Sequence, residues 1–401
     1  MRFLLYSHDS WGLGHLKRSL TIAGALTSRF EGANVMIVTG SPCATQFELP
    51  VNCDVLKLPS ISKDAEGNYV PRSFSADVAA TVQLRSRLIL EAYRAFQPHL
   101  VLVDHQLTGL RSEALRMLRE ARREGRKTIY GMRDVMDSAE AVRAEWASHD
   151  CHWALKCGYD RICVYGRPEV FDPRSQYPIL SAHRHKIEFS GYIVAPLNGA
   201  TREPVTSLQP TVLVTLGGGE DGAQRIDAYL AALAIRPAAW NSRIIAGPLM
   251  DPARVRQFKR QVHSMGLAEQ VKISRFHANI PRLLQSADAV VAMAGYNSCM
   301  EIVQSRIPAV FLARSFPRKE QLIRARRFQE IGIGTCLEEL DPTKLRAAVE
   351  QALVPASKKA KMPKLPLNGT DGLCAIVASL LTGPRHAAAR PRLAAGVSLP
   401  D

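Results

Sequence analysis

The sequence predicts an α/β protein of two Rossmann-like domains, each built on a parallel sheet. Short apolar stretches that do not alternate with polar residues, such as residues 2–6 and 289–293, are typical of parallel strands buried on both faces. Glycine-rich turns and amphipathic helices follow such stretches. The 401 residues suffice for two cores. Residues 196–210, rich in Pro, Gly, Ser and Thr, predict a linker between an N-terminal domain, 1–195, and a C-terminal domain, 211–366.

Three further segments carry expectations of their own. The polar residues 59–73 predict a long loop over the edge of the first sheet. Residues 367–382 predict a last helix that packs back on the first domain. Residues 383–401 contain mainly Ala, Pro and Arg, and this composition predicts a disordered tail.

The chain carries 52 Lys and Arg residues against 37 Asp and Glu residues, a formal net charge of +15. A nucleic acid, an anionic membrane or simply a solvated surface could account for this charge. No aromatic–basic platform occurs, so no nucleic-acid partner is expected. No apolar run approaches the ~20 residues of a membrane span, and residues 2–6 lead straight into a motif rather than a removable signal. We therefore expect a cytoplasmic protein, with peripheral contact at the inner face of the plasma membrane left open.

Residues 288–321 predict strand, turn, helix, strand, turn and helix in succession. The Ala294-Gly295 pair allows a tight turn, and Asn297 or Ser298 is expected to cap the helix that follows. The free N–H groups and the positive dipole end of that helix suit a phosphate. Glu301, about one turn further on, can accept two hydrogen bonds from a vicinal diol such as a ribose.

The second turn of this unit adds Arg318, Glu320 and Gln321 at the same edge of the sheet, where open α/β sheets bind ligands. A phosphate site, a diol acceptor and further polar side chains together describe a site for a nucleotide sugar. The alternative is one more α/β repeat with an ordinary capped helix.

A first glycine-rich turn, residues 7–15, lies between the first strand and a helix. Its glycines allow a ligand to approach the backbone closely. His15 stands at the start of the helix, where the dipole lowers the pKa of a histidine and favours the neutral imidazole. Because a neutral imidazole can accept a proton near pH 7, His15 is a candidate general base. A capping or buried histidine is the alternative.

Other polar residues follow later strands. Asp104-His105 and Arg133-Asp134 are candidates for binding an acceptor or for orienting His15, although each could instead be a turn residue or half of an ion pair. In the second domain, Gly217, Gly218 and Gly219 form a turn that would admit a diphosphate to a helix start. The acids at 220 and 221 would repel a diphosphate, so they are expected to point elsewhere or to contact the sugar.

Residues 294–334 resemble the donor-binding segment of family 28 glycosyltransferases, and Gly12-Leu13-Gly14-His15 resembles the glycine-rich turn that ends in Gly-His in these enzymes. The best-known member adds N-acetylglucosamine to the lipid-linked precursor of peptidoglycan. The resemblance is closer to the uncharacterised "predicted glycosyltransferase" branch and covers the chain to about residue 381. It implies the GT-B architecture, with two Rossmann-like domains facing a central cleft, the first for the acceptor and the second for the donor.

The resemblance also implies roles for individual residues. His15 is the expected catalytic base, Glu301 holds the ribose, Glu320 and Gln321 hold the sugar, and Phe276 lies where a backbone group contacts the base. The full donor-binding set is Gly217, Gly218, Gly219, Gly247, Phe276, Ala294, Gly295, Tyr296, Asn297, Ser298, Glu301, Arg318, Glu320 and Gln321. The acceptor-binding set is His8, Ser10, Trp11, Gly12, Gly14, Asp104, His105, Arg133 and Asp134.

The sequence lacks an Asp-x-Asp pair, with which metal-dependent glycosyltransferases often hold their ion, and its eight cysteines form no Cys-x-x-Cys pair. We therefore expect a metal-independent glycosyltransferase without a cofactor that moves a hexosyl group from a nucleotide-diphosphate sugar, first of all a UDP-sugar, to a hydroxyl acceptor. A lipid-linked or cell-envelope glycan is one candidate acceptor. The alternatives are a nucleotide-sugar 2-epimerase or hydrolase of the same fold, or a basic nucleic-acid- or membrane-binding protein with a vestigial site.

Overall fold

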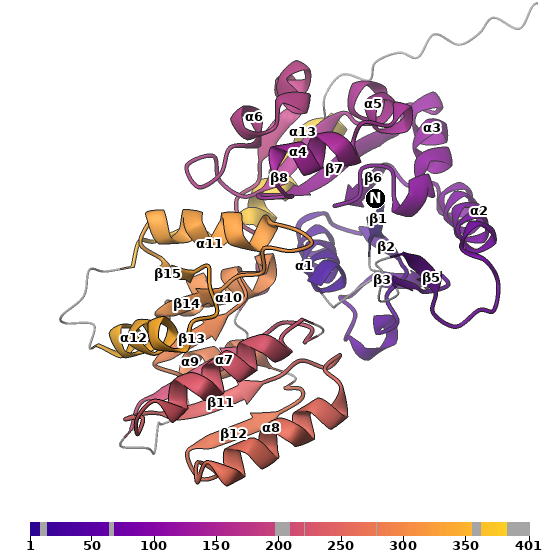
Figure 1. Ribbon diagram of the computed structural model, residues 1–401. Helices are drawn as coiled ribbons and strands as arrows, with labels where there is room; N and C mark the ends of the chain where they lie inside the picture. Colours follow the sequence, from indigo (N-terminus) through magenta and orange to yellow (C-terminus); the bar gives the residue numbers. More distant parts are fainter. Residues whose placement is uncertain are drawn as a thin grey trace, which may run out of the picture.

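The computed structural model describes residues 1–8, 14–63, 68–196, 209–219, 221–277, 279–354 and 362–382. Two parallel sheets, each covered by helices, make two α/β units that lie one above the other in Figure 1. This confirms the predicted fold class. The predicted linker lies almost wholly outside the described residues, and the predicted tail lies entirely outside them.

The first sheet has seven strands in the order β3-β2-β1-β6-β7-β8-β9. Their bounds are β1 Arg2–Ser7, β2 Asn34–Thr39, β3 Cys53–Lys57, β6 Leu100–Asp104, β7 Lys127–Arg133, β8 Arg161–Tyr165 and β9 Ile187–Phe189. The main helices of this unit are α1 Gly14–Arg29, α2 Val78–Phe96, α3 Leu115–Arg123, α4 Ala139–Glu145, α5 His149–Trp153 and α6 Pro173–Gln176. The strand order reverses beside β1, which pairs with both β2 and β6, so the carboxyl ends of β1 and β6 flank a crevice of the kind that binds ligands.

The second sheet has six strands in the order β12-β11-β10-β13-β14-β15. Their bounds are β10 Thr211–Thr215, β11 Asn241–Ile245, β12 Val271–Ser274, β13 Ala289–Ala292, β14 Ala309–Leu312 and β15 Gly334–Leu337. The helices of this unit are α7 Ala223–Ala234, α8 Pro252–Ser264, α9 Ile280–Ser286, α10 Tyr296–Ser305, α11 Glu320–Glu330 and α12 Pro342–Leu353. Here too the order reverses beside a central strand, since β10 pairs with both β11 and β13.

The last helix, α13 (Gly369–Thr382), lies against the first unit rather than the second, as its yellow ribbon beside β8 shows (Figure 1). It contacts α1 and β8. Two glycines permit this close approach, because a Cβ at Gly369 would stand 2.5 Å from the carbonyl oxygen of Gly191 and one at Gly372 would stand 2.0 Å from that of Ser190. One continuous apolar core therefore runs from β1 and α1 through α13 into α10 of the second unit.

The prediction of a structureless loop over residues 59–73 is wrong. Strands β4 (Ile61–Lys63) and β5 (Tyr69–Pro71) pair as an antiparallel hairpin. Ile61 is buried, and the Arg85 guanidinium donates to the carbonyl oxygen of Pro59 at 2.6 Å, so the segment is fixed to α2. The polar composition of the segment hid its pairing.

A fully buried ion pair joins the two units. Arg324 of α11 donates through Nη2 to Asp134 Oδ1 at 2.8 Å, and both side chains have no exposed surface. Arg324 also donates to the carbonyl oxygens of Val135 at 3.2 Å and Ala294 at 3.0 Å. Since Asp134 follows β7 and Ala294 follows β13, one guanidinium connects the carboxyl edges of both sheets.

Arg324→Ala tests this contact. The substitution leaves the Asp134 carboxylate buried without its cation, which costs about 3–5 kcal/mol of unfolding free energy. Arg326→Ala, two residues along the same helix, is the matched control, because the Arg326–Glu338 pair is half-exposed and worth at most about 1 kcal/mol. Urea unfolding followed by circular dichroism measures both variants. Equal, small losses in the two would show that the buried pair does not hold the units together.

Candidate active site

The candidate base lies in a network of charged side chains at the carboxyl edge of the first sheet. His15, in the first turn of α1, places Nδ1 at 2.7 Å from Asp104 Oδ2. Asp104 is the last residue of β6 and is completely buried. Arg18, one turn along α1, donates to both carboxylate oxygens, through Nε at 3.0 Å and Nη2 at 2.6 Å. The hydrogen bond to Asp104 therefore fixes the imidazole of His15 through Nδ1.

Burial controls the protonation of this site. Burial, the largest cause, lowers the pKa of His15 to about 4 together with the charges of Arg18 and Arg133, although the hydrogen bond to Asp104 and its charge oppose this shift. Burial raises the pKa of Asp104, but the charge of Arg18 and the hydrogen bond from His15 outweigh it and hold that pKa well below its usual range. At neutral pH His15 is thus uncharged beside an ionised Asp104, the arrangement that a general base needs.

Two more histidines surround His15. Its ring centroid lies 4.7 Å from that of His105 and 6.0 Å from that of His8. Burial also lowers the pKa of both neighbours well below the usual value. Among the described residues, neither Nδ1 has a hydrogen-bond partner. His105 has a φ of +68°, in the left-handed region. The cluster therefore contains buried, uncharged imidazoles whose Nδ1 atoms have no partner among the described residues.

The second unit presents the start of α10 to the start of α1. The Asn297 side chain donates through Nδ2 to the carbonyl oxygen of Gly14 at 2.8 Å, so the two helix N-termini face each other. The expected cap at Asn297 or Ser298 is wrong, because the helix already begins at Tyr296 and its N-cap is Gly295, which makes no side-chain cap. A Cβ at Gly295 would meet no described residue within 4 Å, so among these residues open space lies beside the first turn of the helix.

Glu301 lies one turn into α10, on its partly buried face. Burial raises the pKa of this carboxyl group, and Lys17 of α1 partly opposes the shift. No hydrogen-bond partner for it occurs among the described residues, although most buried carboxylates are paired. A ligand hydroxyl donating to Glu301 would remove this cost.

The glycine turns of the second unit serve two purposes. A Cβ at Gly219 would stand 2.4 Å from the carbonyl oxygen of Ala246, and one at Gly247 would stand 2.5 Å from the carbonyl of Gly218, so these two glycines let two turns pack together. A Cβ at Gly218 would make only an ordinary contact, 3.5 Å from the Leu249 side chain. Gly217 has a φ of +64°, and a Cβ there would meet no described residue within 4 Å. Among the four glycines, Gly217 therefore leaves its backbone most open to a ligand.

One of the two acids after this turn is neutralised. Asp221 pairs with Arg314 at 2.7 Å, and residue 220 lies outside the described part of the chain. Phe276, after β12, is 55% exposed at the same edge. Its ring is therefore free to contact a base.

Two predicted donor residues, Glu320 and Arg318, bind the first unit, whereas Gln321 binds within its own unit. Glu320 forms an ion pair with Arg133 at 2.5 Å, and Arg318 donates to Glu145 of α4 at 3.0 Å. Gln321 accepts from the backbone N–H of Arg314 at 3.1 Å. The structure thus brings the predicted donor residue Glu320 and the predicted acceptor residue Arg133 into one contact across the interface.

We predicted that Asp134, Ala294 and Tyr296 bind a ligand, but the structure shows them bound to other protein groups. Asp134 is saturated by Arg324, and the carbonyl oxygen of Ala294 accepts from the same arginine. The Tyr296 hydroxyl accepts from the backbone N–H of Ile193, and the side chain is buried. All three are structural because the interface covers them. Ser10, Trp11 and Gly12 lie outside the described residues.

Two arginines of the site and the interface, Arg18 and Arg324, are not among the residues predicted from the sequence. Arg18 stands three residues after His15, which places both on one face of a helix, and this spacing is a signal that could have found it. Arg324 left no such signal, since its partner Asp134 lies 190 positions away.

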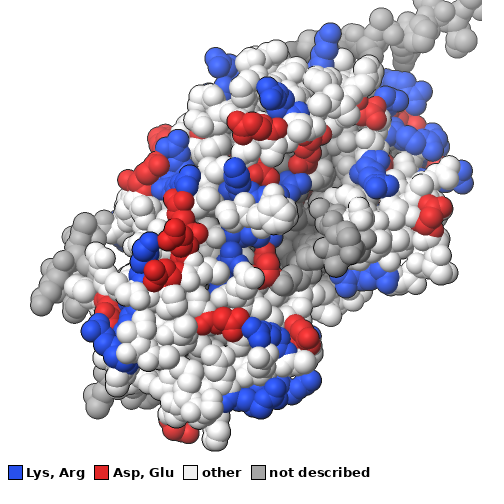
Figure 2. All heavy atoms as spheres, in the orientation of Figure 1, with Lys and Arg blue, Asp and Glu red and all other residues white. Residues whose placement is uncertain are grey.

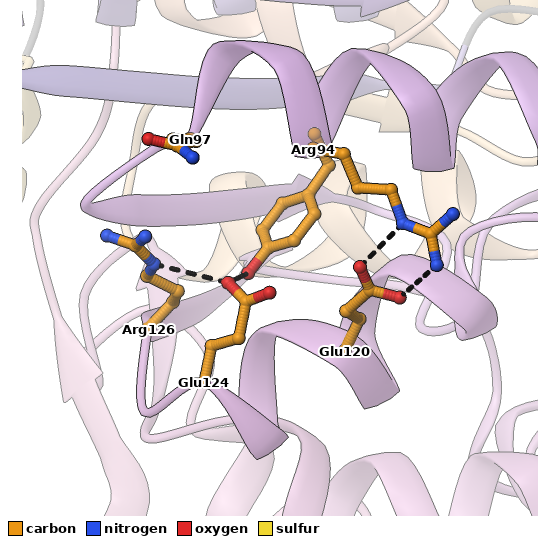
Figure 3. Close-up of a pocket in the computed structure, with 6 residues that line it drawn as sticks. Arg94, Gln97, Glu120, Glu124 and Arg126 are labelled. Carbon is orange, nitrogen blue, oxygen red and sulfur yellow. Dashed lines mark hydrogen bonds and ion pairs between the residues drawn. The ribbon is translucent and has the colours of Figure 1, made fainter.

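Other features of the surface do not join the site. Figure 3 shows a hollow between the ends of α2 and α3, where Arg94 pairs with Glu120 at 2.6 Å and Tyr93 donates to Glu124 at 2.7 Å. Its charged groups are already paired, and it lies away from the histidine cluster. Among the described residues, no group of three His, Cys, Asp or Glu side chains is arranged to hold a metal ion. No helix in the described part has the length and apolar content to cross a membrane.

Most of the second unit is similar to a known family of protein domains. Residues 243–370 match the model of the glycosyltransferase family 28 C-terminal domain. These residues are therefore similar to a family 28 glycosyltransferase domain. The resemblance predicted from the sequence is confirmed, and the match includes Gly247, Phe276 and the whole stretch from β13 to α11.

Curated relatives match parts of this chain. The NDP-glycosyltransferase YjiC of Bacillus licheniformis is 28% identical over 189 residues, which are 45% of this chain and 44% of that protein. The UDP-N-acetylglucosamine--N-acetylmuramyl-(pentapeptide) pyrophosphoryl-undecaprenol N-acetylglucosamine transferase of Anaplasma marginale is 24% identical over 56% of this chain and 63% of that protein. The chain thus spans less than two thirds of the length of either relative.

Solved structures match over nearly the whole chain. The calicheamicin glycosyltransferase CalG4 superposes with a TM-score of 0.61 at 18% identity, covering 96% of this chain and all of that one. MurG of Acinetobacter baumannii gives 0.61 at 13% identity, covering 94% and 99%. At these identities the likeness shows the fold, and it confirms the GT-B architecture around the family 28 domain.

The buried histidines predict a pH-dependent stability. A histidine whose pKa is lowered on folding binds fewer protons in the folded state than in the unfolded state, so stability falls as pH drops from about 6.5 towards 4. Urea midpoints measured across this range should decline for the wild type. His105→Asn should flatten the decline, since asparagine tolerates the positive φ and does not titrate. His263→Asn, at an exposed position on α8, is the control, and equal slopes in all three proteins would contradict the prediction.

Proposed function

We propose that this protein is a metal-independent glycosyltransferase that moves a hexosyl group from a nucleotide-diphosphate sugar to a hydroxyl acceptor. The observation that supports it most directly is the juxtaposition of two helix starts, joined by the 2.8 Å hydrogen bond from Asn297 to Gly14. One helix start carries the uncharged His15 hydrogen-bonded to the ionised Asp104, and the other is the start of α10, followed by Glu301. A base thus faces an anion site across a short distance.

The donor half of the site would lie on the family 28 domain. The diphosphate would accept hydrogen bonds from the N–H groups of Asn297 and Ser298 at the start of α10, aided by the helix dipole and by the open backbone at Gly217. The ribose hydroxyls would donate to Glu301, and the base would lie at the exposed Phe276. The two relatives above are named for NDP and UDP donors, which favours a UDP-sugar.

The acceptor half would lie on the first sheet, at His8 and His105 with Arg133. In the reaction, His15 takes the acceptor hydroxyl proton on Nε2 while the oxygen attacks the anomeric carbon of the sugar. The bond from that carbon to the phosphate oxygen breaks, and its electron pair leaves with the nucleoside diphosphate, which the helix start stabilises. Asp104 holds the new imidazolium through the Nδ1–H.

The acceptor could be a lipid-linked glycan, since the Anaplasma relative is named for an undecaprenol-linked acceptor. Peripheral membrane contact would accompany such an acceptor. Part of the positive charge that would favour this contact lies in residues 358–364 and in the tail from residue 385, and these segments lie largely outside the described part of the chain. Binding to vesicles with and without anionic lipid tests this part of the proposal.

A 2-epimerase or a hydrolase of the same fold would use the same donor site, and product analysis with and without an acceptor separates them from a transferase. A nucleic-acid-binding protein is less consistent with the surface. On the face shown in Figure 2, most Lys and Arg side chains lie beside Asp or Glu side chains rather than in one continuous basic area.

Glu301→Ala should weaken nucleotide-sugar binding by about 1–3 kcal/mol, the usual worth of a hydrogen bond to a charged group. The fold should persist, because no protein group depends on this carboxylate. Glu330→Ala on α11 is the control, since Glu330 pairs with Arg327 of the same helix at 2.6 Å. Calorimetry with a panel of UDP-, GDP- and dTDP-sugars measures both variants. Unchanged donor affinity in Glu301→Ala would remove the ribose assignment.

His15→Ala should lower turnover about 10²–10⁴-fold, the usual worth of a positioned base, with little change in donor affinity. His15→Asn separates catalysis from structure, because asparagine can replace a hydrogen bond to Asp104 but cannot act as the base. Turnover near the wild-type level in His15→Asn would end the catalytic assignment. The assays are run in EDTA, in which the wild type should remain active; loss that magnesium or manganese restores would overturn the metal-independent proposal.

A further inference from the structure

Arg18 has a position that the proposed reaction does not yet use. Its side chain is 3% exposed, and it binds both oxygens of Asp104. The same Nη2 also lies 2.8 Å from His15 Nδ1. Asp104 therefore shares its Oδ2 atom between a guanidinium and the catalytic imidazole, at 2.6 Å and 2.7 Å.

Arg18 also lies between two aromatic rings. Its Cζ atom is 5.5 Å from the ring centroid of Tyr165, on β8, and 5.4 Å from that of Tyr296. Tyr296 is the first residue of α10 and belongs to the other unit. Arg324 approaches the same Tyr296 ring at 5.8 Å. The guanidinium of Arg18 is thus held by a carboxylate from one unit and by a ring from the other.

The hydrogen bonds at His15 Nδ1 decide which ring nitrogen carries the proton, and therefore whether Nε2 can act as a base. With the proton on Nδ1, the imidazole donates to Asp104 and presents a free lone pair at Nε2, which can take the acceptor proton. With the proton on Nε2, Nδ1 accepts from Arg18 and the ring has no lone pair for the acceptor. Small movements of Arg18 therefore shift His15 between a tautomer that can take the acceptor proton on Nε2 and one that cannot.

We propose that Arg18 is a positioning residue that orients Asp104 and His15 for proton transfer, and that it holds this orientation only while Tyr296 of the second unit packs against it. The proposal rests on the proposed function and deepens it, because it makes the base depend on contact between the two units. In an isolated or opened first domain, His15 would then not present its Nε2 lone pair to the acceptor. Proton transfer would be slowed whenever the donor half of the site is absent.

Several charged or titratable groups face His15. They are Asp104 at the end of β6, Arg18 on its own helix, His8 after β1, His105 after β6 and Arg133 at the end of β7. Arg18 is the cation in direct contact with Nδ1, so its removal should raise the pKa of His15 by about one unit or more, leaving Asp104 to favour the imidazolium.

The test follows the His15 imidazole by NMR in the full chain, with the resonance assigned by its loss in His15→Asn. The wild-type ring should stay neutral above about pH 5, whereas the ring in Arg18→Gln should titrate in that range. Arg18→Lys keeps the charge and should restore most of the wild-type titration. An unchanged titration in Arg18→Gln would overturn the proposal. The NMR titration requires no turnover, so its result does not depend on whether the proposed function is correct.

The dependence on the second unit is tested with Tyr296. Tyr296→Leu removes the ring and should shift the His15 titration in the same direction as Arg18→Gln, whereas Tyr296→Phe keeps the ring and should not. If Arg18→Gln does not fold, this pair carries the test, because both variants keep the Arg18–Asp104 ion pair. A wild-type titration in Tyr296→Leu would overturn the dependence. Where glycosyl transfer can be measured, the fall of kcat/KM at acid pH should shift in the same direction as the NMR titration of His15.

Discussion

Two buried aspartate–arginine pairs determine how the halves of this molecule meet. Asp104 and Asp134 end neighbouring strands of the first sheet, and each is bound by an arginine, Arg18 and Arg324 respectively. The two guanidinium groups lie near the same ring, that of Tyr296. Because an unpaired buried charge costs several kcal/mol, neither carboxylate can be left without its arginine. The start of α10 is consequently fixed beside the start of α1.

The chemistry of the site follows from this placement. Parallel strands end at one edge, and helices begin there, so each unit contributes a helix start with free N–H groups. The contact between the units brings the neutral His15 opposite the start of α10, where we propose that an anion binds. Burial lowers the pKa of His15 and of the neighbouring histidines and keeps the rings uncharged, while the charge of Arg18 holds the pKa of Asp104 well below its usual range. The same interface therefore supplies both stability and the protonation states that proton transfer needs.

Local pattern predicted what is local. The buried strands and the Glu301 position one turn into a helix depend on short spacings, and a single sequence shows these. The predicted glycine turn before His15 lies mostly outside the described residues. It did not predict which side chains the interface would occupy. Asn297 was expected to cap its own helix but binds Gly14, 283 positions away. Glu320 was expected to face a sugar but pairs with Arg133, because nothing in a sequence shows which charged residues meet after two domains dock.

The most direct measurement is a crystal structure of the protein with a bound nucleoside diphosphate, UDP first. The account predicts the diphosphate at the start of α10, within hydrogen-bond distance of its first N–H groups, with the ribose hydroxyls on Glu301 and His15 facing the vacant sugar position. A nucleotide bound elsewhere, or one that leaves Glu301 without a contact, would contradict it.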